Sequence, residues 1–332
     1  MTSGEANRRG AARARGLPPG WPWFAVVVVL PFVGASLVLE FVAPEALKLA
    51  GFAGAFVEGP GAEVGHLGDR LTYAALAYVQ IAATVVVIGF YAYRLIGLDR
   101  ERRTGALRLL GVTALSAVAA VAVVRSLQGA AYAVTYLNVR DLLRLTGATG
   151  DFTKSFFSFE AVPYLAEVTR ISIAGGIPFA LGVAAVILAV PVAAAAASFP
   201  TDEPEDWKGE FAARIKWLQE SFYALSVVLV TSTVAIMLFF QLPAEIALET
   251  HRDGLLRYAR GLTVFWGATM TLTLLAAFAP ALLVLRRRAE RRHEAVAASR
   301  EFGEWLAEQV PTTARRQIAN LAAMLGPLAV GP

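Results

Sequence analysis

The sequence predicts an all-α membrane protein, a polytopic bundle of about six transmembrane helices with a short amphipathic helical tail in the cytoplasm. Only 17% of the 332 residues are charged, against roughly a quarter in soluble domains. Hydrophobic residues make up 57% of the chain, and the mean hydropathy is +0.56. Each of four charge-free stretches exceeds the ~20 residues that cross ~30 Å of hydrocarbon; they are residues 71–93, 171–201, 221–244 and 261–285.

The first predicted span covers about residues 23–43. It follows a basic segment, residues 1–20, which we expect to be disordered, and opens with aromatic and proline residues typical of a membrane interface, residues 21–24. A secretory signal peptide is the alternative, because a basic segment precedes an apolar core. We favour a retained anchor, since the core exceeds the roughly 7–15 residues of a signal peptide and no clear A-x-A cleavage site follows it.

Five further spans complete a transmembrane domain over residues 21–286. They are predicted at about residues 71–93, 109–137, 171–198, 221–244 and 261–285. The third of these six spans is the least regular, because Arg125 and Gln128 interrupt its apolar character. We expect its helix to continue beyond the membrane, with Arg125 near the outer boundary.

The distribution of basic residues predicts that both termini are cytoplasmic. With six spans, 20 of the 30 lysine and arginine residues fall in segments that would be cytoplasmic, and 9 fall in outer segments. This asymmetry follows the positive-inside rule. We therefore expect an integral multi-pass protein of a bacterial-type inner (plasma) membrane.

One predicted inner segment, residues 200–220, is rich in acidic residues and therefore supports the cytoplasmic orientation less well than the others. Within it, residues 206–219 have apolar side chains at helical spacing. We interpret this stretch as a helix that lies along the inner interface before the fifth span. A docking surface for a basic partner is the alternative.

The predicted cytoplasmic tail, residues 287–332, begins within a cluster of five arginines at Arg286–Arg292. Such a cluster is typical of a stop-transfer signal on anionic lipid headgroups. Beyond it, residues 289–325 have the pattern of two amphipathic helices separated at Pro311. These helices would pack on each other, on the bilayer, or on a second copy or another protein partner.

The composition also limits the chemistry of the chain. Without cysteine there is no disulfide, thiolate metal site or cysteine nucleophile, and the three histidines lie far apart in sequence. We therefore predict no cofactor, no metal site and no catalytic residue, and the chain is more consistent with a non-enzyme. The pI near 9.5 is explained by basic residues beside the spans, so we do not expect nucleic acid as a partner.

Charged and amide groups near the spans are the candidate site residues, because such groups are costly in hydrocarbon. The candidates for a polar pathway or an outer cavity are Glu40, Gln80, Arg125, Gln128, Gln241 and Glu245. At 1.5 Å per residue, most of them lie about 24–30 Å from the inner boundary, toward the outer face. Only Gln80 falls near the midplane. The outer charges either snorkel to headgroups or face a vestibule in which Arg125 pairs with Glu40 or Glu245.

A candidate helix break lies at Gly175, Gly176 and Pro178, where an interrupted helix would expose backbone groups to such a cavity. Glycines that serve close packing beside a tolerated proline are the alternative.

Two hypotheses for function remain. The first is that the protein handles a small solute or ion across or at the membrane. The second is a non-catalytic membrane scaffold or signalling protein that acts through its cytoplasmic tail and inner loop. A polar cavity shared by Glu40, Gln80 and Arg125 would favour the first, and a dry bundle would favour the second.

Overall fold

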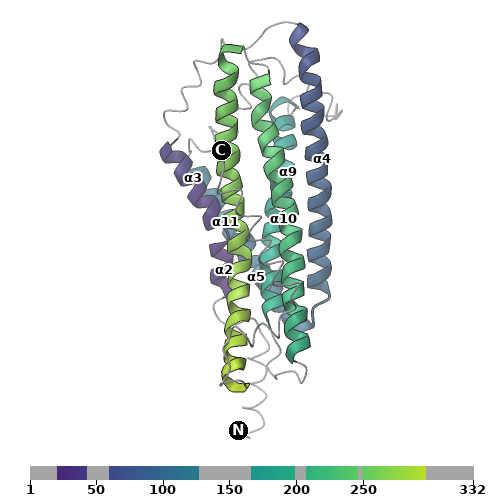
Figure 1. The fold of residues 1–332 in the computed structure, drawn as a ribbon, viewed down its shortest axis with the longest axis vertical. Helices are drawn as coiled ribbons and strands as arrows, with labels where there is room; N and C mark the ends of the chain where they lie inside the picture. The colour runs from purple at the N-terminus through teal and green to yellow at the C-terminus, as the bar shows by residue number, and fades with distance from the viewer. Residues whose placement is uncertain (1–20, 43–59, 127–165, 199–206, 246–248, 297–332) are drawn as a thin grey trace.

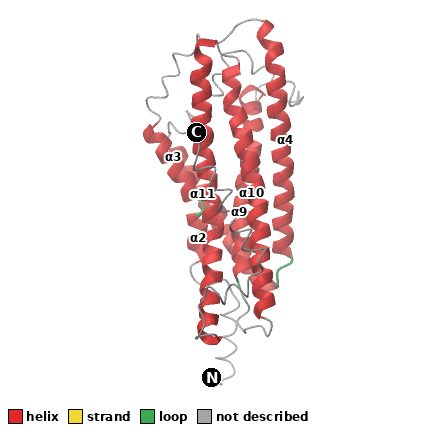
Figure 2. Cartoon of the chain, in the orientation of Figure 1, coloured by secondary structure: helices red, strands yellow, loops and turns green. Residues whose placement is uncertain are grey.

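The computed structural model of the protein describes residues 21–42, 60–126, 166–198, 207–245 and 249–296 (Figure 1). Within these ranges the chain forms seven helices and no strand (Figure 2). Five of the helices are long and apolar enough to cross a membrane. The predicted all-α fold is therefore confirmed. The helices are α2 (Trp21–Val27), α3 (Leu30–Val42), α4 (Pro60–Ile96), α5 (Arg100–Ser126), α9 (Ala166–Ala197), α10 (Trp207–Glu245) and α11 (Glu249–Val296).

The first predicted span is divided into two helices rather than forming one. α2 has 7 residues and α3 has 13, and Figure 1 shows α3 tilted away from the axis of the bundle. Pro31 explains the division, because its nitrogen cannot donate to the carbonyl of Val27 and its ring crowds that carbonyl. The chain turns there, and the Val29 N–H donates to the Val26 carbonyl oxygen with an N···O distance of 3.1 Å. The span expected at about residues 23–43 is thus formed by two helices, and its crossing of the membrane stays a prediction.

A tight turn joins α4 to α5. The N–H of Gly97 donates to the Tyr93 carbonyl at 3.1 Å and closes the end of α4. Asp99 caps the start of α5, since its Oδ1 accepts the N–H of Arg102 at 2.9 Å. We call the end of the bundle with this turn the hairpin end. α2, α5 and α10 begin there, and α4, α9 and α11 end there (Figure 1).

Two helices are much longer than a membrane crossing. α10 has 39 residues and α11 has 48, so α11 extends for about 70 Å at 1.5 Å per residue. The segment expected to lie along the interface was residues 206–219; its described part, residues 207–219, instead forms the first turns of α10. No glycine or proline lies between residues 210 and 242, so nothing in the sequence separates this segment from the span. Likewise, Arg286–Arg292 continues the last span as part of α11.

The core of the bundle surrounds the last turns of α9. This helix contacts α4, α5, α10 and α11. Residues 193–197 are five consecutive alanines, each at most 1% exposed. Small side chains allow neighbouring helices to approach closely, which is the usual packing of helices in membranes.

The outer surface of the bundle is apolar. Large side chains point outward along its length, including Leu115 on α5, Val86 on α4 and Val230 on α10, each at least 62% exposed. Soluble monomers rarely expose extended apolar surface of this kind. Together with the five long apolar helices, this surface identifies the chain as an integral multi-pass membrane protein.

Candidate functional site

Gln80, the polar residue predicted near the midplane, is buried between three helices. Its side chain on α4 is 4% exposed, and its Nε2 donates to the Ser232 Oγ on α10 at 2.8 Å. The same nitrogen lies 3.4 Å from the carbonyl oxygen of Pro178 on α9. We call Gln80, Ser232 and Pro178 the Gln80 node. The amide that the sequence singles out is thus hydrogen-bonded within the bundle.

The predicted helix break in α9 is not present. α9 runs without interruption through Gly175, Gly176 and Pro178, and it contains a second proline, Pro191. A proline inside a membrane helix removes one backbone hydrogen bond, and packing against neighbouring helices offsets that loss. α9 is packed against five other helices, which explains why it tolerates two prolines.

The hydroxyl groups of α10 and α11 mostly bond to their own helices. Eight of them donate to the carbonyl oxygen four residues earlier, at 2.8–3.0 Å; they belong to Ser221, Ser226, Thr231, Thr233, Thr263, Thr269, Thr271 and Thr273. Ser and Thr commonly satisfy their polar groups in this way inside apolar helices. The O–H donors of these eight hydroxyls are therefore all bonded to the backbone.

Four of the remaining candidate residues lie near the ends of their helices that are opposite the hairpin end. Glu40, Arg125 and Glu245 belong to the last turns of α3, α5 and α10, and their side chains are outside the described part of the structure. Gln241 is half-buried on α10, and Gln128 lies outside the described residues. The pairing of Arg125 with Glu40 or Glu245 therefore stays a prediction.

At the hairpin end, charged and aromatic groups link α4 to α10. Arg94 forms an ion pair with Glu220, and its guanidinium carbon lies 5.2 Å from the ring centroid of Trp217. One turn away, the buried Tyr91 hydroxyl donates to the Ser221 carbonyl at 2.6 Å. These contacts fix the position of α10 along the bundle axis relative to α4.

Three arginines from three helices come together near the end of α9. Arg102 of α5, Arg214 of α10 and Arg288 of α11 lie close enough for the charges of each pair to interact, and we call them the arginine cluster. Sequence analysis did not single out Arg102 or Arg214. The one local signal was the spacing of Glu210 and Arg214, which favours an ion pair on one helix face.

Arg102 and Arg214 each pair with a carboxylate of their own helix or its cap. Arg214 is 8% exposed, and its Nε donates to Glu210 Oε1 at 2.7 Å, while its Nη1 donates to the Ala195 carbonyl at 3.3 Å. Arg102 pairs with Asp99, with 3.1 Å between Nε and Oδ2. Because Ala195 lies in the last turn of α9, Arg214 also compensates the negative end of that helix dipole.

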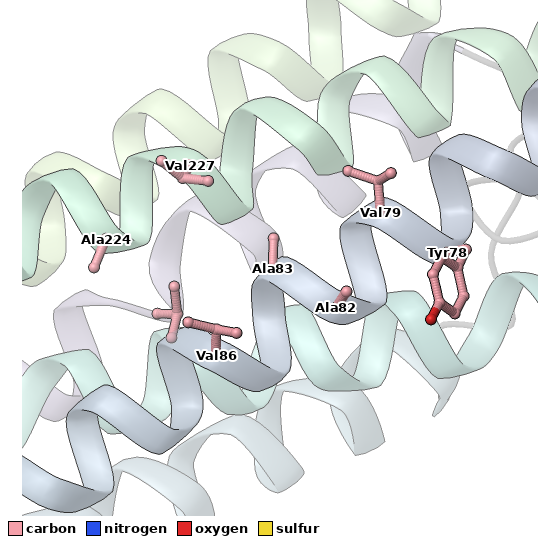
Figure 3. A pocket seen from close by; sticks show the side chains of 8 residues that line it. Tyr78, Val79, Ala82, Ala83, Val86, Ala224 and Val227 are labelled. Atoms are coloured by element: carbon pink, nitrogen blue, oxygen red, sulfur yellow. The ribbon is translucent and has the colours of Figure 1, made fainter.

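An open apolar groove of about 420 Å³ lies between α4 and α10 (Figure 3). Its lining consists of Tyr78, Val79, Ala82, Ala83, Val86 and Val87 from α4, with Ala224 and Val227 from α10. Because nearly all of these side chains are apolar, the groove offers little to coordinate an ion or a polar solute.

Among the described residues, no group of three or more histidine or acidic side chains is arranged to hold a metal ion. Comparison with known proteins finds no matching family model, no matching curated protein and no matching solved structure.

Proposed function

We propose that this protein does not conduct a solute and acts instead as a membrane scaffold or signalling protein, through its hairpin end. The observation that carries the proposal is the Gln80 node. A polar residue near the middle of a pathway would face water or solute, whereas the Gln80 amide donates to Ser232 and lies beside the Pro178 carbonyl. The hydroxyls of α10 and α11 that bond to their own helices give further support, because the polar lining of a solute pathway needs free donors and acceptors.

The concentration of charge at the hairpin end supports the second part of the proposal. Arg94, Glu220 and the arginine cluster lie there, together with the exposed Arg287 and Arg291 of α11. Charged side chains beyond the apolar spans are suited to contacts with headgroups or with other proteins. We further propose that this end faces the cytoplasm, as the excess of basic residues in the predicted inner segments indicates.

Permeability measurements on reconstituted protein test the proposal. Vesicles with and without the protein are compared for Na⁺, K⁺ and proton currents on solid-supported membranes, and for glycerol and urea entry by light scattering. We expect the two kinds of vesicle to behave alike. A protein-dependent current or faster solute entry would contradict a non-conducting role.

Handling of a small solute or ion is the second candidate function. It requires the buried amide and hydroxyl of the Gln80 node to exchange their mutual bond for bonds to a solute. If the vesicles conduct, Gln80→Leu should abolish that conduction. A matched variant, Thr231→Val, should not, because the Thr231 hydroxyl bonds only to its own helix in the described structure.

A further inference from the structure

One face of α4 presents a regular row of residues to the outside of the bundle. Tyr78, Ala82, Val85 and Gly89 are all exposed and follow one another at intervals of four, three and four residues. Residues at such intervals share one face of a helix, and we call these four the α4 stripe. Tyr78 and Ala82 also line the apolar groove between α4 and α10 (Figure 3). The stripe and the groove therefore form one continuous surface.

Gly89 has no packing role among the described residues. A Cβ atom at this position would meet no neighbouring group within 4 Å. Glycine destabilises a helix relative to alanine, and α4 continues through this position without a break. In membranes, glycine is common where the backbones of two helices approach closely. A helix that uses Gly89 in this way must come from outside the described bundle.

Tyr78 places a hydroxyl at a depth where lipid offers no hydrogen-bond partner. Its side chain is 72% exposed and forms no hydrogen bond with the described residues. It lies about 10 Å inside the uncharged stretch that begins at Leu71, which is the depth of the hydrocarbon. Acyl chains would leave this hydroxyl unpaired, which is costly. A tyrosine hydroxyl both donates and accepts, so a second tyrosine hydroxyl at the same depth is a suitable partner.

The exposed area on this face of α4 is of the size that a stable dimer needs. Tyr78, Val85, Val86, Tyr93 and Ile96 are each at least 53% exposed. Since a whole aromatic side chain has roughly 150–250 Å² of surface, these five expose on the order of 600 Å². Each partner in a stable interface contributes about 800 Å². The small stripe residues and the groove add to the area available.

We propose that the α4 stripe and the adjoining groove form the interface of a homodimer, with α4 of a second copy as the occupant. Both copies cross the membrane in the same orientation, so a two-fold axis along the membrane normal brings each stripe residue to its own equivalent. Ala82 and Gly89 then allow the two α4 helices to approach closely. The two Tyr78 hydroxyls lie at one depth and bond to each other.

This dimer is independent of the proposed function. A conducting and a non-conducting bundle could each pair through α4, so the result of the permeability measurement does not bear on it.

Disulfide cross-linking in native membranes tests the interface. The chain has no cysteine, so every cross-link involves the introduced residue. Ala82→Cys and Gly89→Cys are oxidised with copper phenanthroline, and the products are separated without reductant. We expect both variants to give a product of twice the monomer mass, because each residue meets its own equivalent across the two-fold axis.

Leu115→Cys on α5 is the matched control for cross-linking. Leu115 is 70% exposed, and like Gly89 it lies about 6–9 Å from the hairpin-end limit of its uncharged stretch. It should give about tenfold less product, because chance collisions lack the effective concentration of a bound pair.

A substitution of Gly89 tests whether the glycine sets the contact. Gly89→Leu should lower the yield of the Ala82→Cys cross-link by about tenfold or more, because the leucine side chain holds the two helices apart. Gly111→Leu on α5 is the control, since a Cβ atom there also meets nothing within 4 Å. It should leave the yield within about twofold, as expected of a surface substitution. Both variants should keep their helical circular dichroism, because leucine is a better helix former than glycine.

Three results would overturn the proposal. Cross-linking at residues 82 and 89 no stronger than at residue 115 would mean that lipid covers this face. A cross-linked product of another mass would mean that a different protein occupies it. A yield that Gly89→Leu lowers no more than Gly111→Leu would mean that close approach at Gly89 does not form the interface.

Discussion

At the scale of single residues, the buried amide of Gln80 is hydrogen-bonded within the apolar interior. Gln80 and Ser232 bond to each other across α4 and α10, and Thr84 donates to the Gln80 carbonyl at 2.7 Å. Burying an amide in an apolar medium without a hydrogen-bond partner costs several kcal/mol of free energy. Helix packing that provides such bonds is therefore strongly favoured.

The bond between Gln80 and Ser232 leads to a prediction of coupling. Gln80→Leu and Ser232→Ala should each lower the free energy of unfolding in detergent by about 1 kcal/mol, because each removes the same interhelical bond. The double variant should then lose little more than either single variant. As a control, Thr231→Ala should add to Gln80→Leu, because the Thr231 hydroxyl bonds to its own helix. Additivity of Gln80→Leu and Ser232→Ala within about 0.5 kcal/mol would contradict the bond.

Sequence reasoning placed Gln80 near the midplane from its position nine residues into a charge-free stretch, but it could not identify Ser232 as its partner. α10 and α11 carry hydroxyls in successive turns, and their spans are apolar on all sides. The rotation of each helix about its axis is then set by packing in three dimensions, which periodicity does not reveal.

At the scale of the helices, the length of the uncharged stretches predicted where long helices lie. Proline and glycine residues did not predict where a helix is interrupted. The spans near residues 71–93, 221–244 and 261–285 all lie within helices of the structure. Pro31 divides the first span, whereas Pro178 leaves α9 continuous. The same residue type acts differently because α9 is packed among five other helices, while α3 lies at the side of the bundle (Figure 1).

The central position of α9 predicts a sharp contrast between two alanines. Ala195 is fully buried, and a leucine there would overpack the core, so Ala195→Leu should lower the free energy of unfolding by about 1–3 kcal/mol. Ala119→Leu on the outer face of α5 should be nearly silent, because Ala119 is exposed on an apolar surface. Thermal unfolding of both variants in one detergent checks the comparison. Similar losses in the two variants would argue against a central α9.

At the scale of the whole molecule, the fold brings together charged residues that lie far apart in the sequence. Arg102, Arg214 and Arg288 are separated by more than 70 residues from one another, and only the packing of α5, α10 and α11 around α9 brings them together. Counting basic residues segment by segment predicts an orientation from such charges, but it cannot identify which of them meet. The arginine cluster therefore lay beyond what the sequence could predict.

The central claim is that the bundle spans a membrane with its hairpin end in the cytoplasm. The chain has no cysteine, so single cysteines can report the two ends of one helix. Asp253 and Arg287 are both exposed and lie toward opposite ends of α11. With a membrane-impermeant maleimide, we predict that Asp253→Cys is labelled in intact cells and Arg287→Cys only after the membrane is permeabilised. Labelling of both in intact cells would mean that α11 does not cross, and labelling of Arg287→Cys alone would reverse the orientation.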